Sequence, residues 1–332
     1  MDYRKSGVDI YALDSIKKRI GKAVRKTFNS NVVTDFGHFA GGFRLKGYKK
    51  PVLVSSTDSV GTKVKLARLM DRYDTVGEDI VNHSVNDILC TGAKPLFFLD
   101  YLAFSELEPG KVAIIVEGIA KASVRQGMVL IAGETAQLAS VYKPGDFDLV
   151  GTIVGALEEG TLINGEAIRP GDVAVGLRSS GLHTNGYSLA RRVLIDSRNS
   201  PGIEATIPGS KTTVGKALLV PHRSYRAEVE SVKPLLKGVS HITGGGFEGN
   251  ISRLLPRDVD CIIDKKTWKP LPIFKLIKQT GKIHDDEMYR VFNMGIGMVL
   301  IVRAKDCETV MRKTQGTKIG EVVKGKGKVI LV

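Results

Sequence analysis

The sequence predicts an α/β (α+β) protein that folds as two domains. Its 332 residues are roughly twice the length of an ordinary domain, so each half can bury a core of its own. Apolar runs of strand length alternate with segments of helical periodicity along the chain. The turn-rich segment GTLINGEAIRPGD, residues 160–172, predicts a boundary between domains of residues 1–168 and 169–332.

Each element is predicted from its own apolar pattern. In the first half, strands are predicted over residues 52–55, 96–103, 128–132 and 148–157, and helices over 78–89 and 109–126. In the second half, strands are predicted over 173–177, 259–263, 298–302 and 328–332, and helices over 187–195, 250–255, 273–278 and 306–314. Residues 36–50 are rich in Gly and basic residues without a clear period, which predicts a mobile loop that could fold over a ligand.

Charge and composition restrict the partners. Lys and Arg number 49 against 35 Asp and Glu, and the net charge of +14 favours anionic ligands. Only 6% of residues are aromatic and the lysines are scattered, so a nucleic-acid partner is not expected. No apolar run approaches the ~18 residues that span a bilayer, and the N-terminus lacks a signal-peptide pattern, so we expect no membrane partner and a cytoplasmic location. Three widely separated cysteines predict reduced thiols.

The segment VLVSSTDSVGTK, residues 52–63, is a candidate phosphate site. Asp58 follows a β-branched strand, where a carboxylate can hold Mg²⁺, and Gly61, Thr62 and Lys63 offer groups suited to phosphate oxygens. The alternative is a hairpin or strand-to-helix turn in which Asp58 or Thr57 caps backbone N–H groups.

The segment VGEDIVNHSVNDILCTGA, residues 76–93, places short polar side chains on one arc of a helix. A projection at about 100° per residue groups them together. They are Asp79, Asn82, His83, Asn86 and Asp87. Solvent-facing arcs usually carry Lys and Glu, so these short side chains favour a functional site. The alternative is a surface amphipathic helix whose polar side lies in water.

The segment IAGET, residues 131–135, ends another apolar strand with Glu134 and Thr135. Together with Asp58, Asp79 and Asp87, Glu134 gives four acids near strand or helix ends of one domain. Carboxylates gathered in a basic chain repel one another unless a cation lies among them, which favours Mg²⁺. The alternative is that Glu134 or Thr135 caps a helix.

The second half offers two Gly-rich segments. RSSGLHTNGYS, residues 178–188, leads into a predicted helix whose N-terminus could hold a phosphate beside His183 and Asn185; a hydrogen-bonded structural His183 is the alternative. HITGGGFEGN, residues 241–250, fits the dinucleotide pattern G-x-G-x-x-G, so a nicotinamide enzyme is a rival hypothesis, although its preceding strand is short and polar. The chain has no Walker-type loop, because Ser210 and Ala217 stand where that pattern needs Gly and a hydroxyl.

Taken together, these motifs resemble those of the phosphoribosylformylglycinamidine cyclo-ligase (aminoimidazole ribonucleotide synthetase) family of purine biosynthesis. The similarity covers essentially the whole chain. It includes YRKSGVDI at residues 3–10, STDSVGTK, VNDILCTGAKPLFFLDY, GGF, AGETA, SSGLHTNGYSL, HITGGGF and EMYRVFNMGIGM. Each motif alone is weak, but eight of them in a chain of the right length are specific.

The resemblance implies a homodimer in which the N-terminal domains of two subunits form a shared β-barrel, with ATP in an associated groove. It implies catalytic roles for Asp58, Asp87 and His183, and Mg²⁺ binding by Asp58, Asp79 and Asp87. The residues expected to bind the nucleotide or a phosphate are Gly41, Gly42, Gly61, Thr62, Lys63, Asn86, Glu134, Thr135, Asn185, Thr243, Gly244 and Gly245. The C-terminal domain would complete the substrate site.

The implied reaction closes the imidazole ring of formylglycinamidine ribonucleotide to give 5-aminoimidazole ribonucleotide. An amide oxygen is a poor leaving group, so ATP would phosphorylate it, and a substrate nitrogen would then attack and expel phosphate. Charge neutralisation by Mg²⁺, Lys63 and backbone N–H groups should supply most of the acceleration. Two features depart from the family pattern: Ser59 replaces a Gly, and His38 and Phe39 lie in the glycine-rich loop.

Related families are the nearest alternatives. A selenophosphate synthetase would need an early Cys, but the first here is Cys90. The formylglycinamide ribonucleotide amidotransferase is far longer, and thiamine-phosphate kinases lack HTNGYS and EMYRVFN. A nucleic-acid-binding protein, the alternative of a different class, would bind duplexes in a salt-dependent manner without ATP turnover.

Overall fold

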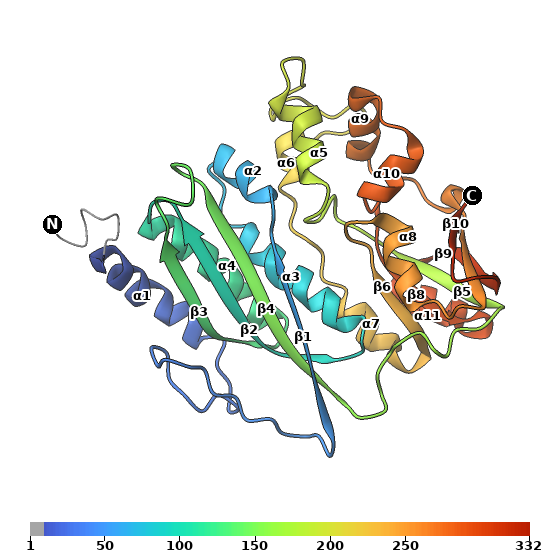
Figure 1. The fold of residues 1–332 in the computed structure, drawn as a ribbon, viewed down its shortest axis with the longest axis horizontal. Coiled ribbons are helices and arrows are strands. Elements are labelled where there is room, and N and C mark those ends of the chain that lie inside the picture. The colour runs from blue at the N-terminus through green and yellow to red at the C-terminus, as the bar shows by residue number, and fades with distance from the viewer. Residues whose placement is uncertain (1–9) are drawn as a thin grey trace. The chain divides into compact units, whose positions relative to one another are not determined.

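The computed structural model describes residues 10–332, with side chains described from Ser15 onward (Figure 1). Residues 3–9 of the YRKSGVDI motif lie outside the described part. The chain divides into two compact units. The first runs to Ile88 and from Ala93 to Thr161, and the second comprises Leu89–Gly92 and Leu162–Val332. Each unit contains one mixed sheet, so the predicted two-domain α/β fold is confirmed at this level.

The first unit is built on a four-stranded sheet in the order β1-β4-β2-β3. Its strands are β1 (Pro51–Ser59), β2 (Lys94–Phe104), β3 (Val129–Gln137) and β4 (Phe147–Glu158). β4 is antiparallel to both β1 and β2, whereas β3 is parallel to β2. Because β1 and β3 are the two edges, the sheet is open within the described residues and does not close into a barrel.

Helices cover one face of this sheet (Figure 1). They are α1 (Ile10–Arg25), α2 (Lys63–Leu69), α3 (Val76–Leu89) and α4 (Pro109–Arg125). Alternate residues of β4 are buried on this face, as expected for a strand with one covered side. Gly151 and Gly155 allow α3 to approach, since a Cβ at either would lie 2.7 Å from the side chain of Ile80 or Ile88. The register of β4 therefore decides which side chains of its neighbours face α3.

The second unit contains a six-stranded sheet in the order β10-β7-β9-β5-β8-β6. Its strands are β5 (Asp172–Arg178), β6 (Leu236–His241), β7 (Val259–Ile263), β8 (Ile296–Arg303), β9 (Thr317–Lys324) and β10 (Val329–Leu331). Neighbouring strands are antiparallel except β7 and β10. The central strands β5 and β8 are apolar and almost entirely buried, as expected for strands covered on both faces.

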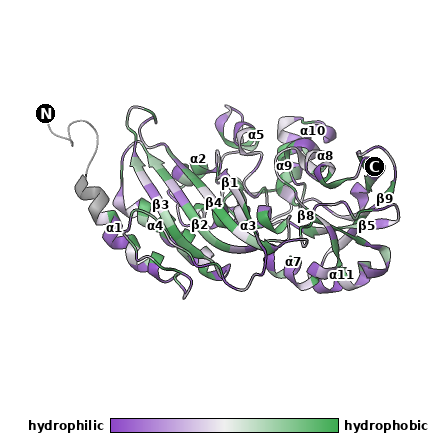
Figure 2. Cartoon of the chain, turned by 60° about the horizontal axis from the view of Figure 1, so that its bottom comes forward, coloured by the Kyte–Doolittle hydropathy of each residue, from purple (hydrophilic) through white to green (hydrophobic). Residues whose placement is uncertain are grey.

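Helices pack on both sides of this second sheet (Figures 1 and 2). On one side lie α7 (Arg226–Val232) and α11 (Cys307–Thr314), and on the other lie α8 (Gly246–Ile251), α9 (Pro272–Gly281) and α10 (Asp285–Val291). Two short helices, α5 (Tyr187–Arg191) and α6 (Val214–Leu218), belong to the same unit. None of the described helices is long and apolar enough to cross a membrane.

Most predicted elements are present with shifted ends. The strand predicted over residues 259–263 has those bounds, and the helix predicted over 78–89 begins two residues earlier. The helix predicted over 187–195 is instead α5 followed by a π-helix, Arg192–Asp196. The helix predicted over 250–255 lies mostly earlier, as α8 and a 3-10 turn that ends at Leu254. Residues 36–50 form neither helix nor strand.

The structure around the G-x-G-x-x-G pattern contradicts the hypothesis of a nicotinamide enzyme. Strand β6 precedes the G-x-G-x-x-G pattern and α8 follows it, but β6 lies at the sheet edge and pairs antiparallel with β8. The dinucleotide fingerprint belongs to a parallel βαβ unit. The glycines therefore serve another purpose, which their contacts reveal.

Candidate active site

Asp58 and Asp87 lie on facing elements of the first unit. Asp58 is near the end of β1, and its pairing with Gly151 turns its side chain toward the helix-covered face. Asp87 lies in the last turn of α3, one turn after His83. The Nε2 atom of His83 is 2.9 Å from Asp58 Oδ2 and 3.4 Å from Asp87 Oδ2. The structure thus brings the two predicted acids together around one imidazole.

The charges of this group depend on one another. Burial lowers the pKa of His83, but the hydrogen bonds and charges of Asp58 and Asp87 outweigh it and raise that pKa to about 9. Burial raises the pKa of Asp58, yet His83 and a backbone N–H lower it further, so the net shift is downward. The side chains of Asp58 and Asp87 are 47% and 25% exposed, whereas that of His83 is 3% exposed. The carboxylates therefore reach solvent above a buried ring.

The oxygen atoms of this group fit a hard divalent cation. The Ser56 hydroxyl donates to Asp87 Oδ2 at 3.1 Å, and the Ser59 N–H donates to Asp58 Oδ1 at 2.6 Å. Carboxylate and hydroxyl oxygens are the ligands that Mg²⁺ prefers, and the exposed side leaves room for the waters it retains. Asp58 and Asp87 could therefore hold magnesium, with Ser56 adjacent.

Asp79 does not join this group. It lies eight residues before Asp87, a rise of about 12 Å along α3. Its Oδ1 atom is 2.8 Å from Lys63 Nζ, and both side chains are fully buried. Burial lowers the pKa of Lys63, and the charge of Asp79 opposes that shift. The structure therefore places Lys63 in an interior ion pair between α2 and α3.

The polar arc of α3 is buried rather than solvated. Asp79, Asn82, His83 and Asn86 are all buried, and Asn82 Oδ1 accepts a hydrogen bond from Gln126 Nε2 at 3.2 Å. The alternative of a surface helix with its polar side in water is wrong. Short polar residues occupy this arc because each must fit and form hydrogen bonds inside the protein.

The turn after β1 contains the other predicted phosphate ligands. Gly61 has a φ of +65°, and Thr62 is the N-cap residue of α2 without a side-chain cap. The segment is thus a strand-to-helix turn, as the structural alternative supposed. Asp58, however, turns toward His83, and the backbone N–H that it accepts is that of the next residue, Ser59.

Glu134 and Thr135 lie inside β3, so the alternative that they cap a helix is wrong. The register aligns Asp58, Gly151, Asp100 and Gly133 across the sheet, which places Glu134 on the opposite face from Asp58. Glu134 is exposed there. The four predicted acids therefore occupy three separate places.

The glycine-rich loop rests against the edge strand β3. A Cβ at Gly41 would lie 2.8 Å from the carbonyl oxygen of Ile131, so only glycine allows this approach. The Gly42 N–H donates to Thr34 Oγ1 at 2.9 Å, and residues 32 and 43 form an isolated β-bridge. The loop is thus a narrow hairpin whose tip, at Phe39, is fully exposed.

In the second unit, the two Gly-rich segments predicted to bind phosphate lie together. Asn185 Oδ1 accepts a hydrogen bond from the Gly244 N–H at 3.1 Å. Gly246 has a φ of +60°, and a Cβ there would lie 1.8 Å from the carbonyl oxygen of Tyr289, so this glycine lets the loop pack against α10. Asn293, from EMYRVFN, donates to the Gly181 carbonyl at 2.9 Å. Three motifs distant in sequence thus support one another.

Comparison with known proteins gives the family. The AIR synthase related protein families, N-terminal and C-terminal domain, match residues 40–157 and 169–332. A phosphoribosylformylglycinamidine cyclo-ligase of Thermoanaerobacter sp. (strain X514) is 45% identical over 337 aligned residues, which cover 100% of both chains. The chain belongs to the AIR synthase related protein family.

Solved structures share the fold of this AIR synthase related protein. A thiamine-monophosphate kinase from Stenotrophomonas maltophilia K279a is 15% identical with a TM-score of 0.65, covering 96% of this chain and 95% of that one. The hydrogenase maturation protein HypE, solved in complex with ATP, is 16% identical with a TM-score of 0.64, covering 93% and 88%. At these identities the likeness concerns the fold alone.

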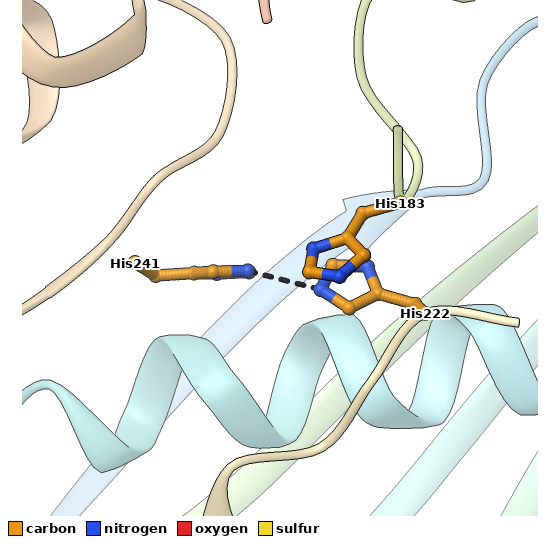
Figure 3. Close-up of side chains that lie close together, drawn as sticks. All are labelled: His183, His222 and His241. Carbon is orange, nitrogen blue, oxygen red and sulfur yellow. Dashed lines mark hydrogen bonds between the residues drawn. The ribbon is translucent and has the colours of Figure 1, made fainter. Parts of the chain in front are cut away.

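A histidine cluster in the second unit of this AIR synthase related protein includes residues that sequence reasoning missed (Figure 3). The rings of His183 and His222 stack with centroids 4.0 Å apart, and His222 Nε2 lies 3.0 Å from His241 Nε2. All three are buried. His241 begins the HITGGGF motif, whereas His222 lies in a loop with no pattern that could have found it.

The hydrogen bonds of His183 define its tautomer. The Ser180 N–H donates to His183 Nε2 at 3.2 Å, so in the neutral ring Nδ1 carries the hydrogen. One nitrogen from each of the three histidines lies within 4.8 Å of the others, a spacing typical of metal sites. In this tautomer, however, Nε2 is occupied as the acceptor of the Ser180 N–H and Nδ1 carries the hydrogen, so the ring does not present a lone pair to a metal ion. His183 is thus hydrogen-bonded, as in the structural alternative, and its catalytic role stays a prediction.

Proposed function

We propose that this chain is a phosphoribosylformylglycinamidine cyclo-ligase, an ATP-dependent enzyme of purine biosynthesis. The observation that carries this conclusion is the 45% identity, along the whole chain, to relatives of that name. The substrate is formylglycinamidine ribonucleotide, and the products are 5-aminoimidazole ribonucleotide, ADP and phosphate. The net charge of +14 suits a protein that binds two polyanions.

The reaction replaces an amide oxygen by a ring nitrogen. The γ-phosphoryl group passes from ATP to the formyl amide oxygen, which releases ADP and makes that oxygen a good leaving group. A substrate nitrogen then attacks the same carbon, and the oxygen departs with the phosphate. No protein nucleophile is needed, so the residues of the chain act by binding, orienting and neutralising charge.

Asp58 and Asp87 are proposed to hold the divalent cation. When bound, Mg²⁺ neutralises charge on the β- and γ-phosphates. The two carboxylates are supported for this role by their convergence on His83 and by their exposed outer side. Asp79 stays a predicted ligand of the cation, but to bind it Asp79 would have to break its ion pair with Lys63.

The other nucleotide residues also stay predictions. Gly61 and Thr62 form the turn beside Asp58, and Asn86 lies one residue before Asp87, so these positions adjoin the proposed cation site. Lys63 would have to leave Asp79 to contact a phosphate. Glu134, Thr135 and the loop at Gly41 and Gly42 belong to the opposite edge of the sheet.

The second unit is proposed to bind a phosphate of the substrate or nucleotide. The contact between Asn185 and Gly244 supports this, because it holds the two Gly-rich loops next to each other, and such loops often bind anions through their backbone N–H groups. His183, Thr243 and Gly245 are the other predicted members. The assignment of residues 169–332 to substrate binding and 1–168 to ATP binding and dimerisation remains part of the proposal.

A homodimer is proposed from the uncovered face of the four-stranded sheet. Leu53 on this face is exposed, and Leu99, Val150 and Val154 are half-buried. Hydrophobic residues run along β2 and β4 (Figure 2). Apolar sheet faces and free strand edges usually acquire a partner, and pairing with a second copy would complete the predicted barrel. Analytical ultracentrifugation should give a dimer mass.

The activity assay supplies the direct test. Protein, Mg²⁺ and ATP mixed with formylglycinamidine ribonucleotide should form ADP and 5-aminoimidazole ribonucleotide in equal amounts. Asp87→Asn should lower the rate by about 100-fold or more, because metal stabilisation is worth several kcal/mol. Glu106→Gln, which changes an exposed acid of the same unit, is the matched control. Absence of product from the wild-type protein, or full activity of Asp87→Asn, would contradict the assignment of function or of cation site, respectively.

A further inference from the structure

His83 occupies a particular place relative to the two acids. It lies on α3 beneath them, almost fully buried, while both carboxylates extend to solvent. Its Nε2 atom is within 3.4 Å of an oxygen from each acid. One acid comes from the strand β1 and the other from the helix α3, so this single nitrogen links two elements.

The hydrogen on Nε2 explains the arrangement. A carboxylate oxygen at 2.9 Å can only accept, so Nε2 carries the hydrogen whether the ring is neutral or charged. Without a common donor, two carboxylates repel each other, and Asp87 indeed acts to raise the pKa of Asp58. A shared N–H on the inner side counters that repulsion, while the side chains of both acids keep part of their surface exposed to solvent.

We propose that His83 is a positioning residue that sets the spacing of Asp58 and Asp87 for a divalent cation, by donating one N–H to both. The proposal rests on the cation site proposed above. In this role His83 does not touch the cation itself; its hydrogen bonds fix the orientation of the carboxylates that bind the metal. The cation approaches from the exposed side, opposite the ring.

Ser56 and Ser59 support the same interpretation. The Ser56 hydroxyl donates to Asp87 Oδ2, the oxygen that His83 also contacts, and the Ser59 N–H holds the other oxygen of Asp58. Both acids are thus restrained by donors from the protein side. Of these donors, only His83 contacts both acids. Its removal should therefore change the distance between the two carboxylates, and not only the side-chain conformation of one of them.

The test compares two substitutions of His83. His83→Leu removes the donor, whereas His83→Gln keeps an N–H at a similar distance from the backbone but has no titratable charge. Mn²⁺ binding is titrated by electron paramagnetic resonance, with and without a non-hydrolysable ATP analogue. We expect His83→Leu to bind Mn²⁺ about 10–100-fold more weakly, and His83→Gln to retain most of the wild-type affinity. Circular dichroism and thermal unfolding establish that both variants are folded.

Two further variants separate the possible failures. His284→Gln, which changes an exposed histidine outside the first unit, should bind Mn²⁺ as the wild type does. If Asp87→Asn binds Mn²⁺ normally, the proposed cation site itself is wrong, and this inference falls with it. If Asp87→Asn loses binding but His83→Leu does not, or if His83→Gln loses as much as His83→Leu, only the positioning role of His83 is overturned.

Discussion

Helix α3 takes part in two clusters of charged side chains, each with acidic and basic members, and the two clusters differ in their exposure to solvent. Near its start, Asp79 pairs with Lys63, and both side chains are fully buried. One and two turns later, His83 and Asp87 meet Asp58, and the two acids are partly exposed. Both clusters place a carboxylate beside a basic side chain, but the first is fully buried and the acids of the second are partly exposed.

The difference separates structural charges from charges that can bind a ligand. A sealed pair keeps its own geometry, because neither partner can be replaced without leaving a charge in the interior. An open pair of carboxylates can exchange water for a cation at little cost in desolvation. A pattern of acids in the sequence therefore does not distinguish the two, whereas burial does.

The largest effect is expected from removal of the buried cation, Lys63. Lys63→Met should lower the free energy of unfolding by about 3–5 kcal/mol, because Asp79 is then a buried carboxylate without its partner. Urea unfolding followed by circular dichroism measures this. The double variant Lys63→Met, Asp79→Leu should recover much of the loss, since an apolar pair can replace a buried ion pair.

The same variants decide whether Lys63 contacts ATP. If Lys63→Met unfolds like the wild type but binds ATP much more weakly, then Lys63 leaves Asp79 to contact phosphate, and the pair is not structural. A large loss of stability that the double variant restores would support a structural pair instead.

The fold was predictable where each segment carries its own signal. The strand at Val259–Ile263 and the helix at Val76–Leu89 have apolar patterns that do not depend on their neighbours. Helix α1 and strand β9 were not predicted, because Lys and Gly interrupt their patterns and their packing partners are distant in sequence. The π-helix after Arg191 has no local signal in the sequence either.

The site was predictable in its acids but not in their grouping. Helical projection placed Asp79, His83 and Asp87 on one arc, and the structure keeps them on α3. The surroundings of each acid depend on other elements. Asp79 forms its buried ion pair with Lys63 of α2, whereas His83 and Asp87 lie beside Asp58 of β1. These contacts are tertiary, so a single sequence does not specify them. The π-stacked His222 is a further example, since nothing in its own segment indicates it.

A third acid of the first unit, Asp100, responds to burial in a different way. Asp100 in β2 is buried over Gly133, where a Cβ would lie 2.4 Å from its Oδ1 atom. Burial raises its pKa to about 7, a backbone hydrogen bond acts in the opposite direction, and the charge of Glu134 adds a smaller upward shift. Asp100 is therefore buried like Asp79, but its raised pKa lets it keep its proton over much of the acid range, where an ordinary carboxyl group is already ionised.

Asp100→Asn should stabilise the protein at high pH. The folded-state pKa lies above the ordinary value of 3.8, so the native state holds the proton more tightly than the unfolded chain does. The contribution of Asp100 to stability is therefore fully present below about pH 4 and is lost as the pH rises to about 7. The gain from Asn should be on the order of 4 kcal/mol at pH 8, at about 1.4 kcal/mol for each of the roughly three units of pKa difference.

Urea unfolding of wild type and Asp100→Asn between pH 4 and pH 8 measures this gain. The advantage of the variant should shrink toward zero at the acid end. A constant difference across the range would show that Asp100 does not titrate there, and that burial alone does not govern the charge of these acids.

The smallest effect is expected for an ion pair whose side chains are both more than half exposed. Arg72 and Asp74 precede α3, with Arg72 Nε 2.9 Å from Asp74 Oδ1 and side chains 57% and 55% exposed. Arg72→Ala should cost less than about 1 kcal/mol, and the cost should vanish in 1 M salt because water and ions already screen the pair. The loss caused by Lys63→Met should hardly respond to salt. Urea unfolding of both variants at low and high salt makes the comparison, and an equal salt response would mean that exposure does not separate the two kinds of pair.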